Sequence, residues 1–180
     1  LIAVISLYRP GPMDSIPRYI ECRHRPEKVQ FRHPLLRDIL DVTYGCIVYQ
    51  EQVMQIFRSL AGYSLGRADI VRRAMSKKKA DVMEKERQIF IYGLVNEDGT
   101  VEVDGCIRRG VDEETAKAIF GEMESFASYA FNKSHATAYA LLAYQTAWLK
   151  CYYPQEYMAA LLTSVLDMTN KLSAYIAECI

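Results

Sequence analysis

The chain has 180 residues, 51% of which are hydrophobic, and its 22 Lys and Arg side chains balance 22 Asp and Glu side chains. This length allows one domain with a substantial core, and the composition is that of a globular protein rather than of a disordered or collagen-like chain. Because the net charge is zero, the overall charge gives no indication of a nucleic-acid partner. The charge is uneven, however, because the stretch from Gly66 to Lys79 holds six basic residues against one acidic residue.

The five cysteines are widely spaced and form no CxxC pair, which favours free thiols over a zinc site. There is no signal peptide and no transmembrane run, so we expect a cytoplasmic protein without a membrane partner. The chain opens on LIAVISL without a methionine and stops inside a helical pattern at AYIAECI. We therefore expect it to be a piece of a longer protein.

The first third of the sequence predicts short helices that prolines and glycines separate. Residues 1–7 are an apolar run, either helix or strand, and the RPGP turn at residues 9–12 ends it. Residues 13–33 are basic and irregular, with one possible short helix at 15–23, and a helical turn follows at 35–41. Residues 47–61 have helical periodicity, and Gly62 ends that helix.

Three amphipathic helices are expected in the middle of the chain. Ser64 can cap the first, at residues 65–75, and Asp112 can cap the third, which ends near residue 128. The second covers residues 81–95 and directs Val82, Ile89 and Phe90 inward. After a turn at residues 96–99, apolar residues alternate around Asp104-Gly105. The fold is thus predicted to be mainly α, with at most one short β-hairpin or extended loop at about residues 100–108.

The stretch from Tyr129 to Pro154 has a polar tip, Asn132 to His135, followed by fourteen residues without a charge, Ala136 to Leu149. A helix that is apolar on nearly every face is either buried or in lipid, and this one is too short and too polar for a bilayer. We therefore expect a buried core helix. Its amino end could bind an anion, or Ser134 could simply be the N-cap and Lys133 a solvated side chain. Pro154 then begins a further helix, and a last one follows residue 169.

The strongest chemical signal is the segment RRAMSKKK, which places Arg72, Arg73 and the three lysines Lys77, Lys78 and Lys79 within eight residues. Arginine grips phosphate through two parallel hydrogen bonds and lysine adds a mobile charge. The segment therefore suits a polyphosphate or a nucleic-acid backbone. The alternative is a solvated helix end, where cations also favour the negative pole of the dipole.

Other polar residues give weaker signals. Ser134 and His135 are a poor candidate for a nucleophile with its general base, since adjacent residues on a helix do not face each other. His135 is better interpreted as a hydrogen-bond donor to a phosphate or as a packed histidine. Gln50 and Glu51 could line a site or form a solvated first turn. Carboxylate pairs such as Glu84 and Glu86 are expected at solvated positions, so no metal site is predicted in this chain.

Four long motifs, in this order, resemble the α subunit of bacterial DNA polymerase III, the family C replicative polymerases. They are LYRPGPM (7–13), YGCIVYQEQVMQI (44–56), GYSLGRADIVRRAMSKKK (62–79) and FASYAFNKSHATAYALLAYQTAWLKCYYPQEYMAALL (126–162). The resemblance implies the end of the palm and a basic connecting segment at residues 1–34, and a helical fingers subdomain at residues 35–180. One departure is residues 98–109, which look like a short insertion relative to the family.

The resemblance also implies a function, that of a DNA-directed DNA polymerase, a nucleotidyltransferase of DNA replication. In such an enzyme this region would bind the incoming deoxynucleoside triphosphate and help to position the primer–template. Mg²⁺ would be held by palm aspartates that lie upstream of residue 1 in the family, so this piece alone would hold no catalytic residue. Other replicase subunits are expected to bind elsewhere on the full-length protein.

The resemblance also implies which residues form the nucleotide pocket. Phosphate contacts are expected from Arg72, Arg73, Lys77, Lys78, Lys79, Lys133, Ser134 and His135, and pocket lining from Arg9, Gly11, Gln50 and Glu51. A different class of function stays open from the residues alone, namely a helical module that binds nucleic acid or a protein without chemistry. Such a module would bind DNA in a salt-sensitive manner that triphosphates do not compete.

Overall fold

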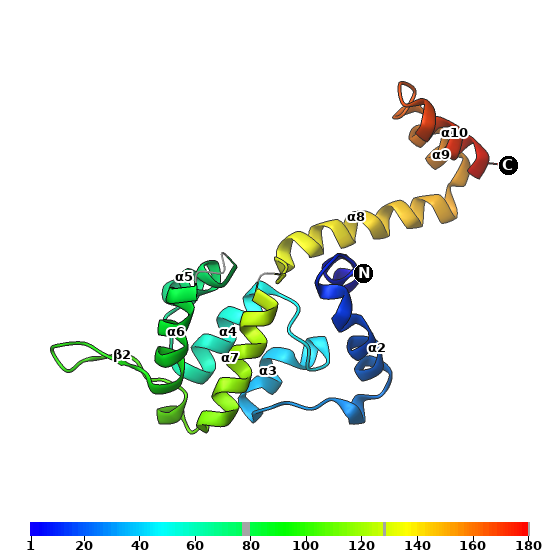
Figure 1. Cartoon of the computed structure of the whole chain (residues 1–180). Coiled ribbons are helices and arrows are strands. Elements are labelled where there is room, and N and C mark those ends of the chain that lie inside the picture. The colour runs from blue at the N-terminus through cyan, green and yellow to red at the C-terminus, as the bar shows by residue number, and fades with distance from the viewer. Residues whose placement is uncertain (77–79, 128, 180) are drawn as a thin grey trace. The chain divides into compact units, whose positions relative to one another are not determined.

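The structure is a computed structural model that describes residues 1–76, 80–127 and 129–179, and it is mainly α-helical, as predicted (Figure 1). The chain divides into two compact units, Ile2–Ala136 and a second made of Leu1 with Thr137–Ile180. The helices and strands are α1 (Ile2–Leu7), α2 (Ile16–His24), α3 (Arg37–Leu40), α4 (Gln50–Ala61), α5 (Leu65–Ser76), α6 (Ala80–Tyr92), β1 (Leu94–Val95), β2 (Val101–Val103), α7 (Glu113–Ala127), α8 (Lys133–Tyr152), α9 (Pro154–Thr163) and α10 (Thr169–Glu178). The 3₁₀ turns are η1 (Pro12–Ser15), η2 (Pro26–Lys28), η3 (Pro34–Leu36), η4 (Asp41–Thr43) and η5 (Ile107–Arg109).

The core of the unit Ile2–Ala136 is built around α4, which packs against α5, α6 and α7 (Figure 1). Four apolar side chains of α4 at helical spacing are fully buried, namely Val53, Ile56, Phe57 and Leu60. The Phe57 ring lies edge to face on Phe90 of α6 and Phe120 of α7, with centroids 5.2 and 6.2 Å apart. One face of α4 thus fixes the position of the three helices that follow it.

Local capping signals placed several helix ends correctly. The Ser64 hydroxyl accepts a hydrogen bond from the Arg67 N–H at 3.2 Å, and the Asp112 carboxylate accepts one from the Thr115 N–H at 2.8 Å. Pro154 opens α9, as predicted. The inward position of Val82 was wrong, because its side chain is 38% exposed and Met83 fills the core-facing position of α6 instead.

The small sheet is antiparallel, and its second strand lies within the predicted stretch at residues 100–108 whereas its first strand lies before it. β1 pairs with β2 across the turn at residues 96–99, so that Leu94 is opposite Val103. Asp104-Gly105 follows the hairpin rather than turning it, because the chain there returns to the helices. The Gly105 N–H donates to the Ala61 carbonyl at 3.0 Å, and the Cys106 N–H donates to the Phe90 carbonyl at 2.8 Å.

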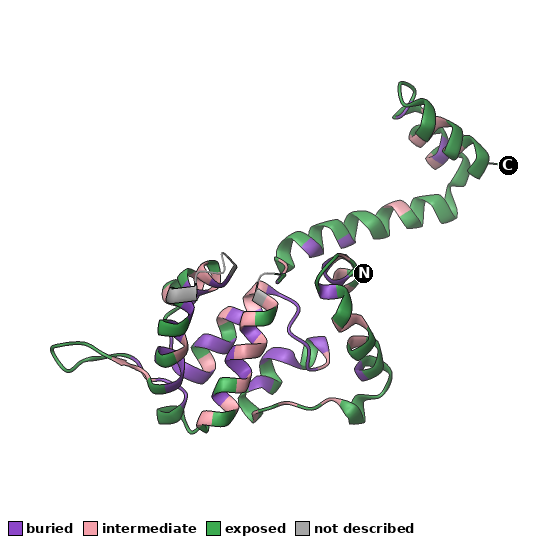
Figure 2. Cartoon of the chain, viewed as in Figure 1, coloured by how far each residue is buried: buried purple, intermediate pink, exposed green. Residues whose placement is uncertain are grey.

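The unit of Leu1 and Thr137–Ile180 holds most of α8 together with α9 and α10, and α9 packs on α10. The prediction that residues 136–149 form a buried core helix was wrong for this chain. Tyr139, Leu142 and Trp148 are 53%, 54% and 43% exposed, and Figure 2 shows the helix exposed along most of its length. An apolar pattern indicates that a helix needs a partner to cover it, and the described residues do not cover residues 136–149 of α8.

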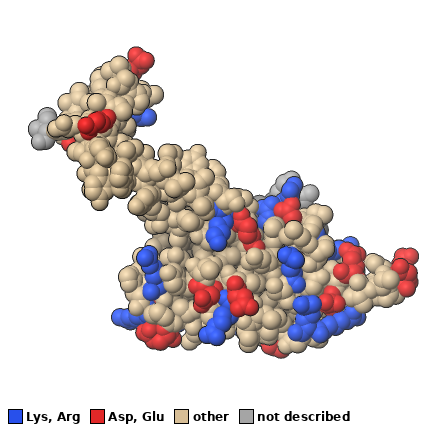
Figure 3. Space-filling view, turned by 180° about the vertical axis from the view of Figure 1, so that it is seen from behind, with Lys and Arg blue, Asp and Glu red and all other residues tan. Residues whose placement is uncertain are grey.

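On the face drawn in Figure 3, many charged side chains of the unit Ile2–Ala136 lie next to charges of the opposite sign. Glu122 on α7, for example, lies 2.9 Å from Arg32 and 3.9 Å from Arg18. Such exposed pairs contribute little to stability. Over the part of the chain that the structure describes, no helix combines the length and hydropathy needed to cross a bilayer.

Candidate functional site

Three of the sequence motifs meet where the segment before α4 runs beside the segment before α8. Tyr49 and Phe131 form a parallel β-bridge. The Gln50 N–H donates to the Phe131 carbonyl at 3.0 Å, and the Phe131 N–H donates to the Val48 carbonyl at 3.2 Å. The Gln50 side-chain amide adds a bond of 3.0 Å to the Ala130 carbonyl, 80 residues away. Gln50 is therefore bound to protein rather than solvated.

Gln52 supports this bridge from inside the core, a role that the sequence analysis missed. Its side-chain oxygen accepts hydrogen bonds from the N–H groups of Val48 and Tyr49 at 2.9 and 3.0 Å. Its side-chain amide donates to the Ile39 carbonyl at 3.1 Å and to the Thr43 hydroxyl at 2.7 Å. The residue is only 4% exposed, so this buried amide has a partner for each of its polar atoms.

The RPGP turn lies against the other side of the bridge. The Arg9 guanidinium donates to the Tyr129 carbonyl and stacks over the Phe131 ring at 4.5 Å. Gly11 has a φ of 102°, and a Cβ there would overlap the Tyr129 ring. Only glycine fits this position without strain. Arg9, Gly11 and Gln50 are thus brought together, although their role toward a ligand stays a prediction.

The first turn of α8 is capped by two side chains. The Asn132 side-chain oxygen accepts from the His135 N–H at 2.8 Å, so Asn132 and not Ser134 is the N-cap. The Glu51 carboxylate accepts from the Lys133 N–H, with its oxygens at 3.1 and 3.2 Å. These two N–H groups are therefore already bonded within the protein. An anion at this helix end would have to contact side chains rather than these N–H groups.

The side chains of this turn reach solvent. Lys133, Ser134 and His135 are all exposed. The Lys133 ammonium lies 5.4 Å from the centre of the Tyr49 ring, and the His135 ring lies 5.5 Å from that of Phe131. Burial raises the pKa of Tyr49 to about 12, so the ring beside the ammonium stays neutral at physiological pH.

Arg72 and Arg73 lie in the last turns of α5 and share one acidic partner. Asp69 lies 2.8 Å from the Arg72 guanidinium and 2.7 Å from that of Arg73. Hydrogen bonds from Arg72 and then Arg73 lower the pKa of this carboxyl. The Arg72 side chain is 15% exposed and that of Arg73 is 68% exposed. Lys77, Lys78 and Lys79 lie outside the residues that the structure describes.

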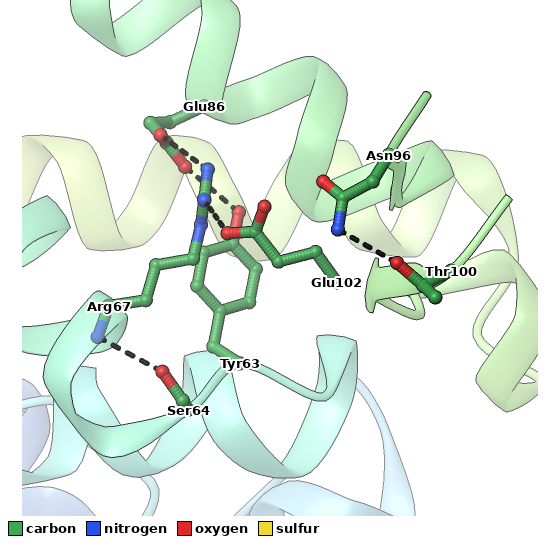
Figure 4. A network of polar contacts seen from close by, with 7 residues as sticks. All are labelled: Tyr63, Ser64, Arg67, Glu86, Asn96, Thr100 and Glu102. Atoms are coloured by element: carbon green, nitrogen blue, oxygen red, sulfur yellow. Dashed lines mark hydrogen bonds and ion pairs between the residues drawn. The ribbon is translucent and has the colours of Figure 1, made fainter. Parts of the chain in front are cut away.

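A partly buried polar network anchors the amino end of α5 (Figure 4). The Arg67 guanidinium donates to Glu86 of α6 at 3.0 Å and also to Glu102 of β2. The Tyr63 hydroxyl donates to the second Glu86 oxygen at 3.1 Å, and burial followed by the Glu86 charge raises the pKa of Tyr63. The prediction that Glu86 is solvated was therefore wrong. The network ties α5 to α6 and to the hairpin.

Imidazole, thiolate and carboxylate groups are common protein ligands of metal ions. Among residues 1–76, 80–127 and 129–179, no group of three or more His, Cys, Asp and Glu side chains is arranged to hold a metal ion. The side chains that meet at the first turn of α8 include cations, a hydroxyl and aromatic rings.

Comparison with known proteins gives a family match. Residues 1–98 match the model of the "Bacterial DNA polymerase III alpha subunit finger domain". The chain is 51% identical over 179 residues to the DNA polymerase III subunit alpha of Neisseria meningitidis serogroup A. It is 50% identical over 183 residues to that of Thermus aquaticus and 48% identical over 187 residues to that of Pasteurella multocida.

These alignments cover 99 to 100% of the chain but only 14 to 15% of each relative. The chain thus spans about one seventh of the length of the curated relatives that it matches. The site described above lies partly inside the residues matched by the family model and partly beyond them, since residues 129–135 follow residue 98.

Proposed function

The chain belongs to the finger-domain family of bacterial DNA polymerase III alpha subunits, and from this membership we propose that it is the fingers region of a replicative DNA-directed DNA polymerase. In this proposal it binds the incoming deoxynucleoside triphosphate and helps to position the primer–template. Residues 1–34 would be the end of the palm with a connecting segment, and residues 35–180 the fingers. The full-length protein would act in the cytoplasm with other replicase subunits.

The observation that carries the proposal is the meeting of the RPGP, YQEQ and FNKSH motifs around the first turn of α8. Hydrogen bonds hold this turn on a core helix, while Lys133, Ser134 and His135 stay exposed beside it. Fixed cations of this kind can stabilise the charge that develops on a leaving pyrophosphate without reorganising during the reaction. Lys133, Ser134 and His135 would form one wall of the nucleotide pocket.

The second wall in this proposal is the basic end of α5. Arg73 is well exposed, and Arg72 is held beside it through Asp69. A triphosphate could take the place of one carboxylate contact, because guanidinium groups bind phosphate and carboxylate with the same planar geometry. Lys77, Lys78 and Lys79 are included from the family resemblance alone.

Mg²⁺ is expected for nucleotidyl transfer, but the residues described here do not fit it. The metal ions would be held by residues of the full-length protein outside this chain. The contribution of this chain is then confined to charge and position, so we assign it no catalytic residue.

The test is the kinetics of Arg72→Ala and Lys133→Ala in the full-length protein on a primed template. Loss of one charged contact to phosphate is expected to lower kcat/KM for the nucleotide by about 10- to 100-fold. Arg108→Ala and Lys171→Ala, which remove exposed cations elsewhere, should leave kcat/KM unchanged. Wild-type kinetics in both test variants would refute the proposal, and salt-sensitive DNA binding that nucleotides fail to compete would favour a binding module without chemistry.

A further inference from the structure

Glu51 makes a contact that the proposed phosphate role of Lys133 does not by itself require. Both carboxylate oxygens lie within 3.2 Å of the Lys133 main-chain nitrogen, at the point where α8 begins. Two residues earlier, the Tyr49 ring lies beneath the Lys133 ammonium at 5.4 Å. The segment 49–51 therefore holds Lys133 at both its backbone and its charged end.

The segment that contacts Lys133 is itself anchored in the core. Glu51 is in the first turn of α4, whose inner face is fully buried at Val53 and Ile56. The neighbouring Gln50 N–H is bonded to the Phe131 carbonyl at 3.0 Å. The negative charge of this carboxylate also interacts favourably with the positive, amino-terminal end of the α8 dipole. It can therefore set where α8 starts and in which direction its first side chain extends.

We propose that Glu51 is a positioning residue, which fixes the first turn of α8 so that the Lys133 ammonium reaches the phosphates of the incoming nucleotide. This inference rests on the proposed function, since it assigns Lys133 a phosphate partner. Displacement of a positioned group by about 1 Å can cost on the order of a hundredfold in rate. Glu51 would therefore affect nucleotide use without touching the nucleotide.

A simple capping role makes a different prediction. A cap stabilises the helix, and its loss lowers the melting temperature without a specific effect on nucleotide binding. A positioning role acts through Lys133, so the effect of removing Glu51 must depend on whether the Lys133 side chain is present. A double-mutant cycle measures this dependence.

The experiment measures single-nucleotide incorporation by the full-length protein with Glu51→Ala, Lys133→Ala and the double variant. We expect Glu51→Ala to raise the nucleotide KM about tenfold in the wild-type background and less than about twofold in the Lys133→Ala background. Glu51→Asp keeps the charge but is too short for the contact, so it should resemble Glu51→Ala. Glu51→Gln keeps one oxygen acceptor and should raise KM less than Glu51→Ala does.

Glu114 provides the matched control, because it is an exposed glutamate in the first turn of another helix, α7. Glu114→Ala should leave KM unchanged. Additive effects of Glu51→Ala and Lys133→Ala would overturn the positioning role while leaving the proposed function intact. Wild-type kinetics of Lys133→Ala would instead overturn the role of Lys133 itself. If Glu51→Ala does not fold, the same cycle with Glu51→Gln and Lys133→Ala gives the same decision, because a positioning role again requires that the two effects are not additive.

Discussion

Replacing Gln52 with leucine tests how the bridge between residues 48–50 and 130–131 is supported. The substitution keeps a similar volume but removes the side-chain oxygen that accepts from the buried N–H groups of Val48 and Tyr49. Each of the two buried donors left without an acceptor costs about 1–3 kcal/mol, and the leucine side chain returns about 1.5–3 kcal/mol through apolar burial. We therefore expect Gln52→Leu to lower the free energy of unfolding by about 2 kcal/mol.

The assay is urea-induced unfolding of the 180-residue chain followed by circular dichroism, which reports on its helices. Gln55→Leu is the matched control, because Gln55 is exposed on the same helix and its replacement should change stability by less than about 0.5 kcal/mol. Equal free energies of unfolding for the two variants would show that the buried amide is not needed to satisfy the bridge. The reasoning that ties the bridge to the core would then be refuted.

Three further predictions concern glycine, tyrosine and cysteine side chains. Gly99 and Gly105 both have a positive φ, but of these two only Gly105 would place a Cβ against backbone atoms, those of Gly93. In thermal unfolding, Gly99→Ala should therefore destabilise the chain by roughly 1 kcal/mol and Gly105→Ala by several times as much. The raised pKa of Tyr63 stabilises the protonated native state, so wild-type stability should fall as pH rises above 10, and Tyr63→Phe should remove this part of the loss; identical pH profiles would contradict it. Iodoacetamide at neutral pH should modify the exposed thiols of Cys151 and Cys179 first. The buried thiols should react only on unfolding, which mass spectrometry can verify; they are Cys22, Cys46 and Cys106.

Features that depend on neighbouring residues were predictable from the sequence. Ser64, Asp112 and Pro154 fix helix ends through bonds or dihedral preferences within one turn, and the structure has those ends where the sequence predicts them. The buried face of α4 was also predictable, since its apolar residues repeat at helical spacing.

Features that depend on distant partners were not predictable. Glu51 caps a helix that begins 82 residues later, and no local pattern marks such a pair. Glu86 was expected at a solvated position, yet Arg67 of α5 and Tyr63 of the segment before α5 both contact its carboxylate. The burial predicted for residues 136–149 was wrong, because the apolar pattern of a helix does not indicate which part of the chain would cover it.

The pairing of residues 48–50 with 130–131 has a topological consequence. The chain departs from one point at α4 and returns to the same point before α8, so the helices between form a closed excursion with the β-hairpin at its outer part (Figure 1). Doubling the length of a flexible loop costs only about 0.6 kcal/mol in closure entropy. Residues added at the 96–99 turn would therefore lengthen the excursion without moving its two ends. Evolutionary changes in length can accumulate there while the first turn of α8 keeps its place.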